Sequence, residues 1–268
     1  MSEGFSADWL ALREPCDAAA RSPVLAERLR AWCHGRGPLR VLDLGAGTGA
    51  NLRWTAPLLG GGQAWTLVEL DPALIAAGEP LLAAAEPAWR YRRLDLARDL
   101  EALADEPADL FTASALLDLV GEPWLAWLVR LRAAAGAALY LALSYDGRIL
   151  WDPVDEDDAT VAALVNRHQR TDKGFGPALG PEAVLGLRRA LADAPGELLI
   201  ERADWRLGPA DGVLQAALLA GWAEAATAIA PEHQAPVAAW AERRGRLIAE
   251  SGSRLVVGHL DVLFLPAA

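Results

Sequence analysis

Three glycines directly after a short apolar run are the feature that most constrains the fold of this chain. Residues 39–44 are mostly Leu and Val, and glycines follow at positions 45, 47 and 49 before a helical pattern begins. Glycines between a strand and a helix let a ligand approach the backbone, next to the positive end of the helix dipole. Gly45-x-Gly47-x-x-Ala50 also fits a dinucleotide-binding loop loosely. Asp43 argues against that interpretation, because its carboxylate would repel a pyrophosphate and suits a ligand with an ammonium group.

Short apolar runs alternate with segments of helical periodicity from residue 39 to residue 144. We expect strands at residues 39–44, 64–69, 89–93, 108–113 and 137–144, and helices at 50–59, 72–85, 97–104 and 123–135. Such alternation predicts βαβ crossovers and a parallel sheet. Residues 1–37 are helical in pattern, with breaks expected at Pro15 and Pro23, and should form an N-terminal cover.

The regular alternation ends after residue 144. Residues 145–180 are polar and rich in Gly and Pro, which predicts a mobile lid or substrate loop. A helix at 181–194, a strand at 197–207, two helices within 211–251 and a final strand within 252–268 are expected to follow. His259 and Asp261 of that last strand should be satisfied polar groups in the core. The acidic run at 155–158 should be a solvated loop, because it lacks the spacing of metal ligands.

Composition excludes several classes of protein. The 25 basic and 36 acidic residues give a formal net charge of −11, which argues against nucleic acid as a partner. No apolar segment reaches the roughly 18 residues that a membrane span requires, and the N-terminus lacks the pattern of a signal peptide. Two cysteines form no metal-site spacing. We expect a cytoplasmic, single-domain protein, monomeric or homodimeric, without metal and without membrane contact.

Four motifs in order give a more specific indication. VLDLGAGTG at 41–49 resembles motif I of the class I S-adenosylmethionine-dependent methyltransferases, and LVELDP at 67–72 resembles their second motif. LDL at 94–96 and ADLFTASALLDLV at 108–120 are similar to the third and fourth. The resemblance implies an α/β, doubly wound, Rossmann-like fold with a seven-stranded, mostly parallel sheet and an antiparallel last strand. Residues 38–144 would form its cofactor-binding half, and 211–251 a helical insertion between strands six and seven.

The same resemblance implies which residues bind S-adenosylmethionine. Glu69 would hold the ribose hydroxyls, while Asp95 and the backbone of Leu96 would contact the adenine. The complete implied cofactor site consists of Arg13, Asp43, Gly45, Ala46, Gly47, Glu69, Leu70, Asp95, Leu96 and Ala113.

An arginine of the N-terminal segment commonly pairs with the methionine carboxylate in this family. Arg13 and Arg21 are both candidates for that role. The alternative for Arg13 is a surface salt bridge to the neighbouring Glu14 or Asp17.

Candidate substrate residues lie outside the four motifs. Asp118 follows the fourth strand, where the family often places a substrate-facing polar residue, and helix capping is its alternative role. His168 is the second candidate catalytic residue, because an imidazole titrates near neutral pH. We hypothesise that Arg167, Arg170 and Lys173, the only lysine of the chain, hold a carboxylate or phosphate of a small-molecule substrate. A salt-bridge network between this cluster and residues 155–158 is the alternative.

The residues leave three functions open. The main hypothesis is methyl transfer from S-adenosylmethionine to a small molecule, an in-line displacement that depends on alignment. The first alternative is an NAD-dependent oxidoreductase, which Asp43 and the later motifs disfavour. The second is a non-catalytic regulatory protein that binds S-adenosylmethionine without turnover.

Overall fold

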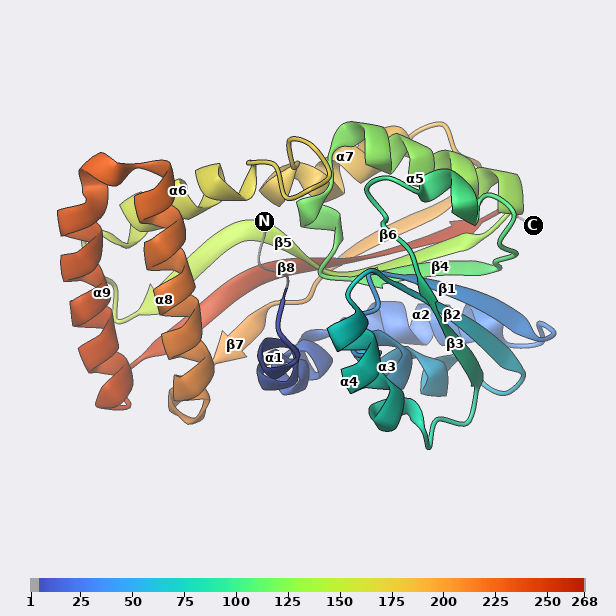
Figure 1. Cartoon of the computed structure of the whole chain (residues 1–268), viewed down its shortest axis with the longest axis horizontal. Coiled ribbons are helices and arrows are strands. Elements are labelled where there is room, and N and C mark those ends of the chain that lie inside the picture. Colours follow the sequence, from blue (N-terminus) through green and yellow to red (C-terminus); the bar gives the residue numbers. More distant parts are fainter. Residues whose placement is uncertain (1–4, 268) are drawn as a thin grey trace.

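One β-sheet runs through the molecule (Figure 1). The computed structural model describes residues 5–267. Its strands are β1 (Leu39–Leu44), β2 (Gln63–Glu69), β3 (Ala88–Arg93), β4 (Leu110–Ser114), β5 (Ala138–Asp152), β6 (Gly196–Arg202), β7 (Trp205–Leu207) and β8 (Arg254–Pro266). They lie in the order β3-β2-β1-β4-β5-β8-β6, and β7 pairs with β8 outside this row. Strands β1 to β5 are parallel and β8 is antiparallel to its neighbours. The predicted fold class is confirmed, and β7 adds a short eighth strand.

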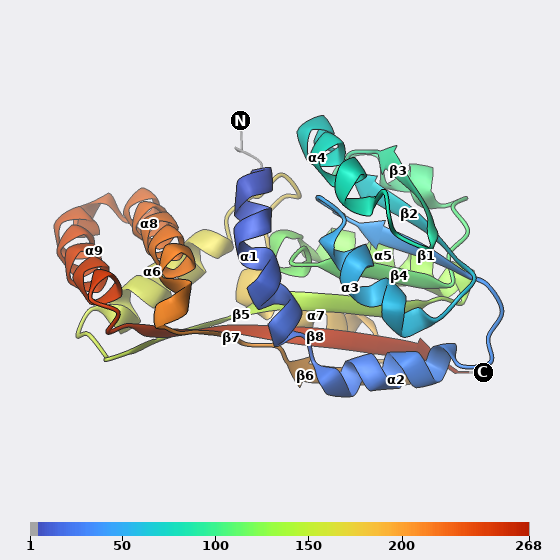
Figure 2. The same cartoon turned by 90° about the horizontal axis from the view of Figure 1, so that it is seen from below.

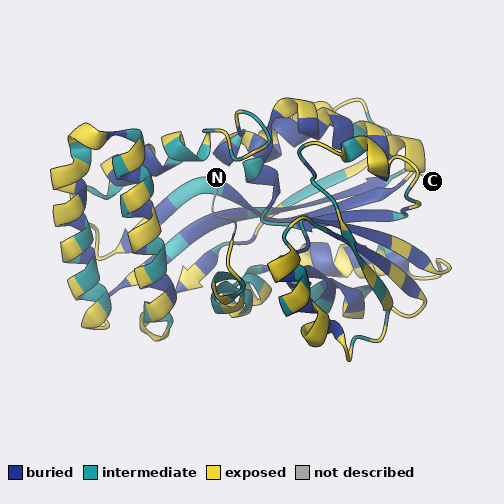
Figure 3. Ribbon diagram, in the orientation of Figure 1, coloured by how far each residue is buried: buried dark blue, intermediate teal, exposed yellow. Residues whose placement is uncertain are grey.

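Helices cover both faces of the sheet. They are α1 (Ala7–Ala20), α2 (Pro23–Cys33), α3 (Ala50–Leu59), α4 (Pro72–Leu82), α5 (Glu122–Ala135), α6 (Asp158–Gln169), α7 (Ala183–Ala190), α8 (Gly212–Ile229) and α9 (Gln234–Ala249). Helices α5 and α7 lie on one face, and α2, α3 and α4 lie on the other (Figure 1). Each face has its own apolar cluster, and the central strands between them are buried (Figure 3). Burial of this apolar area is the main stabilising contribution to the sheet.

Several predicted boundaries are wrong. Helix α1 continues through Pro15, so the break predicted there is wrong. The break predicted at Pro23 is confirmed: α2 begins at Pro23, and the Ser22 hydroxyl caps it by accepting a hydrogen bond from Leu25 N at 3.2 Å. The helix expected at 97–104 is only a 3-10 turn, Leu100–Leu103. The strand expected at 197–207 is divided into β6 and β7 at residues 203 and 204.

Most of the predicted lid at 145–180 is regular structure. Strand β5 continues to Asp152, far beyond its predicted end, and pairs with the first half of β8 in a long extension of the sheet, where β7 pairs with the other edge of β8 (Figure 2). Tyr145, Ile149 and Trp151 of this extension pack with α6 and α8 in a third apolar cluster. The prediction weighed the polar residues and glycines and missed the inward-facing aromatic side chains. Within residues 145–180, the segments between β5 and α6 (residues 153–157) and between α6 and the turn Gly180–Glu182 are irregular.

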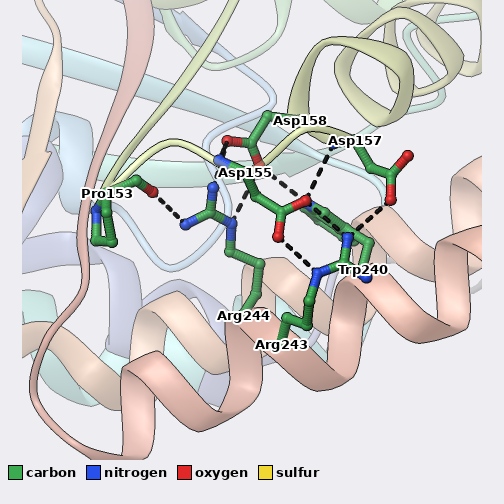
Figure 4. A network of polar contacts seen from close by, with 7 residues as sticks. All are labelled: Pro153, Asp155, Asp157, Asp158, Trp240, Arg243 and Arg244. Carbon is green, nitrogen blue, oxygen red and sulfur yellow. Dashed lines mark hydrogen bonds and ion pairs between the residues drawn. The ribbon is translucent and has the colours of Figure 1, made fainter.

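The predicted helical insertion consists of α8 and α9, which pack on each other and on α6. The acidic run at 155–158 attaches α9 to the start of α6 (Figure 4). Arg243 binds Asp155 at 2.6 Å and Asp157 at 2.7 Å, and the fully buried Arg244 pairs with Asp158. The run is therefore not a solvated loop, and its partners are not the basic residues at 167–173.

One stretch, Pro209–Ile229, is long and apolar enough by length and composition to cross a membrane. It does not count as an uninterrupted apolar segment, because Asp211 and Glu224 lie within it. Leu214, Leu219 and Trp222 of this stretch are buried in the third cluster. A core helix meets the same criterion, so the expected lack of membrane contact stays a prediction.

Candidate active site

A cleft of about 730 Å³ lies where β1, β2 and β4 end. The carboxyl ends of parallel strands meet at this edge of the sheet, which is where open α/β sheets bind ligands. One side of α1 from Leu10 to Asp17, the first turn of α4, the loop after β3 and residues 173–175 complete its walls. The predicted site residues that line it are Arg13, Gly45, Ala46, Gly47, Glu69, Leu70, Asp95, Leu96 and Lys173.

The glycine loop forms the floor of the cleft. Gly45 and Gly47 have φ angles of 66° and 53°, which favour glycine. A Cβ on Gly47 would come within 3.0 Å of Leu10, because α1 lies across this loop. Tyr91 Oη donates a hydrogen bond to Gly47 O at 3.1 Å and fixes the loop from the other side. The loop therefore presents bare backbone to the cleft.

Glu69 connects this loop to the start of α4. One carboxylate oxygen accepts a hydrogen bond from Gly47 N at 2.8 Å. The other accepts from Leu70 N at 2.8 Å and from Asp71 N at 2.9 Å. The side chain thus lies in the cleft wall at the end of β2, where the resemblance places the acid that holds the ribose.

Asp43 is buried beneath the loop and does not line the cleft, so its predicted part in cofactor binding stays a prediction. Its Oδ1 accepts from Asn51 Nδ2 at 2.7 Å, and its Oδ2 has no partner among residues 5–267. Burial raises the pKa of Asp43 to about 7, although the Asn51 bond and the charge of Arg21 oppose the shift.

Asn51 is a site residue that sequence reasoning missed. It lines the cleft at the start of α3, and its Oδ1 accepts from Arg21 Nη1 at 2.9 Å. Arg21 also donates to Ser114 Oγ at 3.2 Å and lies over the ring of Trp54, 4.8 Å from its centroid. Arg21 therefore holds the network under the glycine loop and is not a wall residue. The position of Asn51, directly after the last glycine, was the available signal.

The loop after β3 forms the far wall. Asp95 Oδ1 accepts from Ala97 N at 2.9 Å, and Leu96 O accepts from Trp124 Nε1 at 2.9 Å. Both predicted residues face the cleft. Ala113 is buried within β4 and does not, and the next residues, Ser114 and Ala115, line the cleft in its place.

Arg13 lines the cleft and also forms a salt bridge. Its Nε is 2.9 Å from Asp17 Oδ2, and its guanidinium lies 4.9 Å from the centre of the Trp205 ring. Trp205 Nε1 donates to the same Asp17 at 3.0 Å. The local ion pair that the sequence left open as an alternative is thus present at the wall of the cleft.

The basic residues at 167–173 do not form one cluster. Arg167 donates to the carbonyl of Ile229, and Arg170 lies 3.7 Å from Glu182. Neither lines the cleft, whereas Lys173 does. His168 contacts Lys173, with 3.3 Å between Nδ1 and Nζ. Burial lowers the pKa of both groups, and the charge of Lys173 lowers that of His168 further.

Asp118 is buried behind the cleft. It lies in a 3-10 turn, Leu117–Leu119, and its Oδ1 has no partner among residues 5–267. Burial raises the pKa of Asp118 to about 6. Leu116 and Leu119 on either side line the cleft, and Asp118 does not. In the described part of the chain no group of three or more His, Cys, Asp or Glu has the arrangement of a metal site.

The arrangement fits S-adenosylmethionine on three structural grounds. The left-handed glycines leave the backbone open to a ligand, an acid lies at the end of β2, and a buried carboxylate oxygen without a partner lies under the loop. A carboxylate there favours a cationic ligand and disfavours the pyrophosphate of a dinucleotide.

Comparison with known proteins agrees with this fit. A sequence-family model described as a methyltransferase domain matches residues 41–135. No curated protein matches the chain in sequence. A cyclopropane-fatty-acyl-phospholipid synthase-like protein from Lactobacillus casei shares the fold, with a TM-score of 0.56 and 13% identity over 97% of this chain and 94% of that one.

A second solved structure is a SAM-dependent methyltransferase from Thiobacillus denitrificans in complex with S-adenosyl-L-homocysteine. It has 16% identity over 97% of this chain and 98% of that one, with a TM-score of 0.44. The family match includes the glycine loop, Glu69, Asp95 and the segment after β4. On the motifs and this match, residues 41–135, which carry the glycine loop and the cleft wall around it, are a methyltransferase domain.

Proposed function

We propose that this protein transfers a methyl group from S-adenosylmethionine to a small acceptor that carries a carboxylate or phosphate. The observation that supports the acceptor class is Lys173, a cation in the wall of the same cleft that the glycine loop and Glu69 line. In a chain of net charge −11, a lysine that has no acidic partner among residues 5–267 and lies in such a cleft favours an anionic ligand.

The cofactor end of the cleft combines backbone groups with carboxylates. Gly45 and Gly47 would face the methionine part, Glu69 the ribose, and Asp95 with Leu96 the adenine. When bound, S-adenosylmethionine supplies an electrophilic methyl group on a sulfonium. Asp43 contributes negative charge beneath the loop, and Asn51 with Arg21 keeps its carboxylate in place.

The acceptor end combines one cation with apolar walls. Leu116, Leu119 and Phe175 line the cleft together with Lys173, so an acceptor there would lose water while its anionic group binds the ammonium. Arg13 is already neutralised by Asp17, which leaves Lys173 as the stronger candidate for the charge-assisted bond. Such walls serve methyl transfer by aligning the reactants and excluding water.

In methyl transfer to the acceptor we assign neither Asp118 nor His168 a proton-transfer step, because neither lines the cleft. His168 acts through Lys173, whose Nζ it contacts at 3.3 Å. It is therefore a positioning residue for the ammonium.

The test has two stages. Calorimetry with S-adenosylhomocysteine measures the cofactor site, and release of S-adenosylhomocysteine is then followed against a panel of small carboxylates and phosphates. Lys173→Ala should lower kcat/KM about 10- to 100-fold, the equivalent of roughly 1.5–3 kcal/mol for a charge-assisted bond. The affinity for S-adenosylhomocysteine should not change.

Arg188→Ala is the matched control, since Arg188 is an exposed cation on α7 away from the cleft. An equal kcat/KM for Lys173→Ala and the parent would contradict the anionic class. Tight S-adenosylhomocysteine binding without turnover of any acceptor would favour the non-catalytic alternative.

A further inference from the structure

Lys173 is the only lysine of the chain, and its polar surroundings are unusual. It lines the cleft. Within residues 5–267 its Nζ contacts one polar side-chain atom, His168 Nδ1, at 3.3 Å. No carboxylate among residues 5–267 forms an ion pair with it, and burial alone accounts for the lowered pKa of Lys173. A carboxylate beside a lysine stabilises the protonated ammonium. A neutral imidazole stabilises the ammonium charge much less.

The acid next to Lys173 in sequence is engaged within the loop. Asp172 Oδ1 accepts from Gly174 N at 2.7 Å and from Gly176 N at 3.0 Å, so its carboxylate closes a turn. The loop is attached to the body of the protein by Leu179 N, which donates to Val120 O at 2.9 Å. The ammonium of Lys173 is thus held at the cleft wall with an acceptor nitrogen beside it.

We infer that Lys173 is a self-methylation site, modified by the bound methyl donor when no acceptor fills the cleft. This inference rests on the proposed function, because it requires S-adenosylmethionine in the same cleft. It concerns a residue of the protein as the substrate, which the methyl transfer to a small molecule does not include.

The chemistry balances without a further reactant. Lys173 first gives one proton to His168 Nδ1 or to water, which frees the lone pair on Nζ. That lone pair forms the new nitrogen–carbon bond, the methyl–sulfur bond breaks, and its electrons remain on sulfur as S-adenosylhomocysteine leaves. The product is a methylammonium, which loses a proton before a second transfer. Desolvated lysines are activated as nucleophiles in this way.

Methylation would alter the acceptor site without removing its charge. Each methyl replaces an N–H donor and adds volume at the cleft wall, so charge-assisted bonds to an anionic acceptor become weaker. An anion bound to Lys173 would in turn keep the amine protonated and protect it.

The first test uses the full chain incubated with S-adenosylmethionine in the absence of acceptor. Intact mass should increase by one to three methyl groups, and peptide mapping should place them on residue 173. Lys173→Arg retains the charge and should show no increase, while S-adenosylhomocysteine binds both proteins equally by calorimetry.

The outcomes separate the two claims. No methylation, or methylation of another residue, in a protein that binds S-adenosylhomocysteine normally overturns the self-methylation site and leaves the proposed function intact. No binding of S-adenosylhomocysteine overturns the proposed function itself.

A second readout needs no methyl transfer. An amine-acylating reagent should modify Lys173 with a pH midpoint below that of a free lysine side chain, and S-adenosylhomocysteine should slow the reaction. Lys173→Arg identifies the signal, since only the N-terminal amine remains. A rate that S-adenosylhomocysteine does not change would show that Nζ lies outside the cofactor cleft and would overturn the inference.

Discussion

Tyr145 and His259 face each other directly across the β5–β8 ladder, just beyond the level where β4 ends opposite Ala142. The middle of β8 therefore lies at the functional edge of the sheet. The sequence predicted the end of β5 at residue 144 and so did not indicate this pairing. His259 is buried against Tyr145 and the ring of Trp205, whose centroid is 4.9 Å from its own. His259 does not hydrogen-bond to Asp261, because the Asp261 carboxylate accepts from Ser22 N and Leu143 N instead.

The burial of His259 predicts sensitivity to acid. Desolvation lowers the pKa of His259 to about 3, from an ordinary value near 6.5. Below pH 6.5 the unfolded chain takes up a proton that the folded protein refuses, so stability falls progressively until about pH 3. His259→Gln should lose less unfolding free energy between pH 7 and pH 5 than the parent, measured by urea unfolding. His233→Gln, a partly exposed histidine, is the control, and equal losses in all three proteins would contradict this.

Glu69→Ala should weaken binding of S-adenosylhomocysteine by one to two orders of magnitude. The charge-assisted bonds to the ribose account for roughly 1.5–3 kcal/mol, and the loop loses the acceptor for Gly47 N as well. Calorimetry measures the affinity and circular dichroism confirms folding. Glu101→Ala, an exposed acid in the 3-10 turn Leu100–Leu103, should bind as the parent does. A folded Glu69→Ala with parental affinity would refute the placement of the second motif.

Asp43 should make cofactor affinity depend on pH near neutrality. The pKa of its carboxyl is raised to about 7, so the group gains its charge as pH rises from 6 to 8. Since the charged form favours an ammonium ligand, the affinity for S-adenosylhomocysteine should increase over this range. Asp43→Asn should bind more weakly and lose most of the pH dependence. A parental pH profile in this variant would assign the dependence to another group.

Arg244 and Arg243 should differ in their effect on stability. The Arg244 side chain is fully buried on Asp158 and donates to Pro153 O at 2.6 Å, so Arg244→Met leaves a buried carboxylate without its partner and should cost about 3–5 kcal/mol. Arg243 is one-third exposed, and Arg243→Ala should cost much less than Arg244→Met, because solvent screens its ion pairs. Urea unfolding tests both, and equal losses would show that burial does not decide the difference.

Hydrogen exchange should separate the ordered and irregular parts of residues 145–180. The β5 extension and α6 should be protected without ligand, because their apolar side chains are buried. The segment between α6 and Gly180, which includes Lys173, should gain protection when S-adenosylhomocysteine binds. A gain spread equally over the β5 extension would instead support the lid as first predicted.

The sequence by itself determined the cofactor half of the site. The glycines, Glu69 and Asp95 belong to short continuous motifs, each at the end of a strand whose apolar run is visible in the sequence. Parallel strands bring those ends to one edge whatever the rest of the chain does. The first and last residues of β1 and of α3 are those predicted, because both elements adjoin the glycine motif.

Only the tertiary structure decided the acceptor half. Arg167, Arg170 and Lys173 are close in sequence, yet their side chains leave α6 and the following loop in different directions and only Lys173 reaches the cleft. The partners of the acidic run lie more than eighty residues away, on α9. Side-chain direction and long-range pairing depend on how elements pack, and packing is fixed by the whole core.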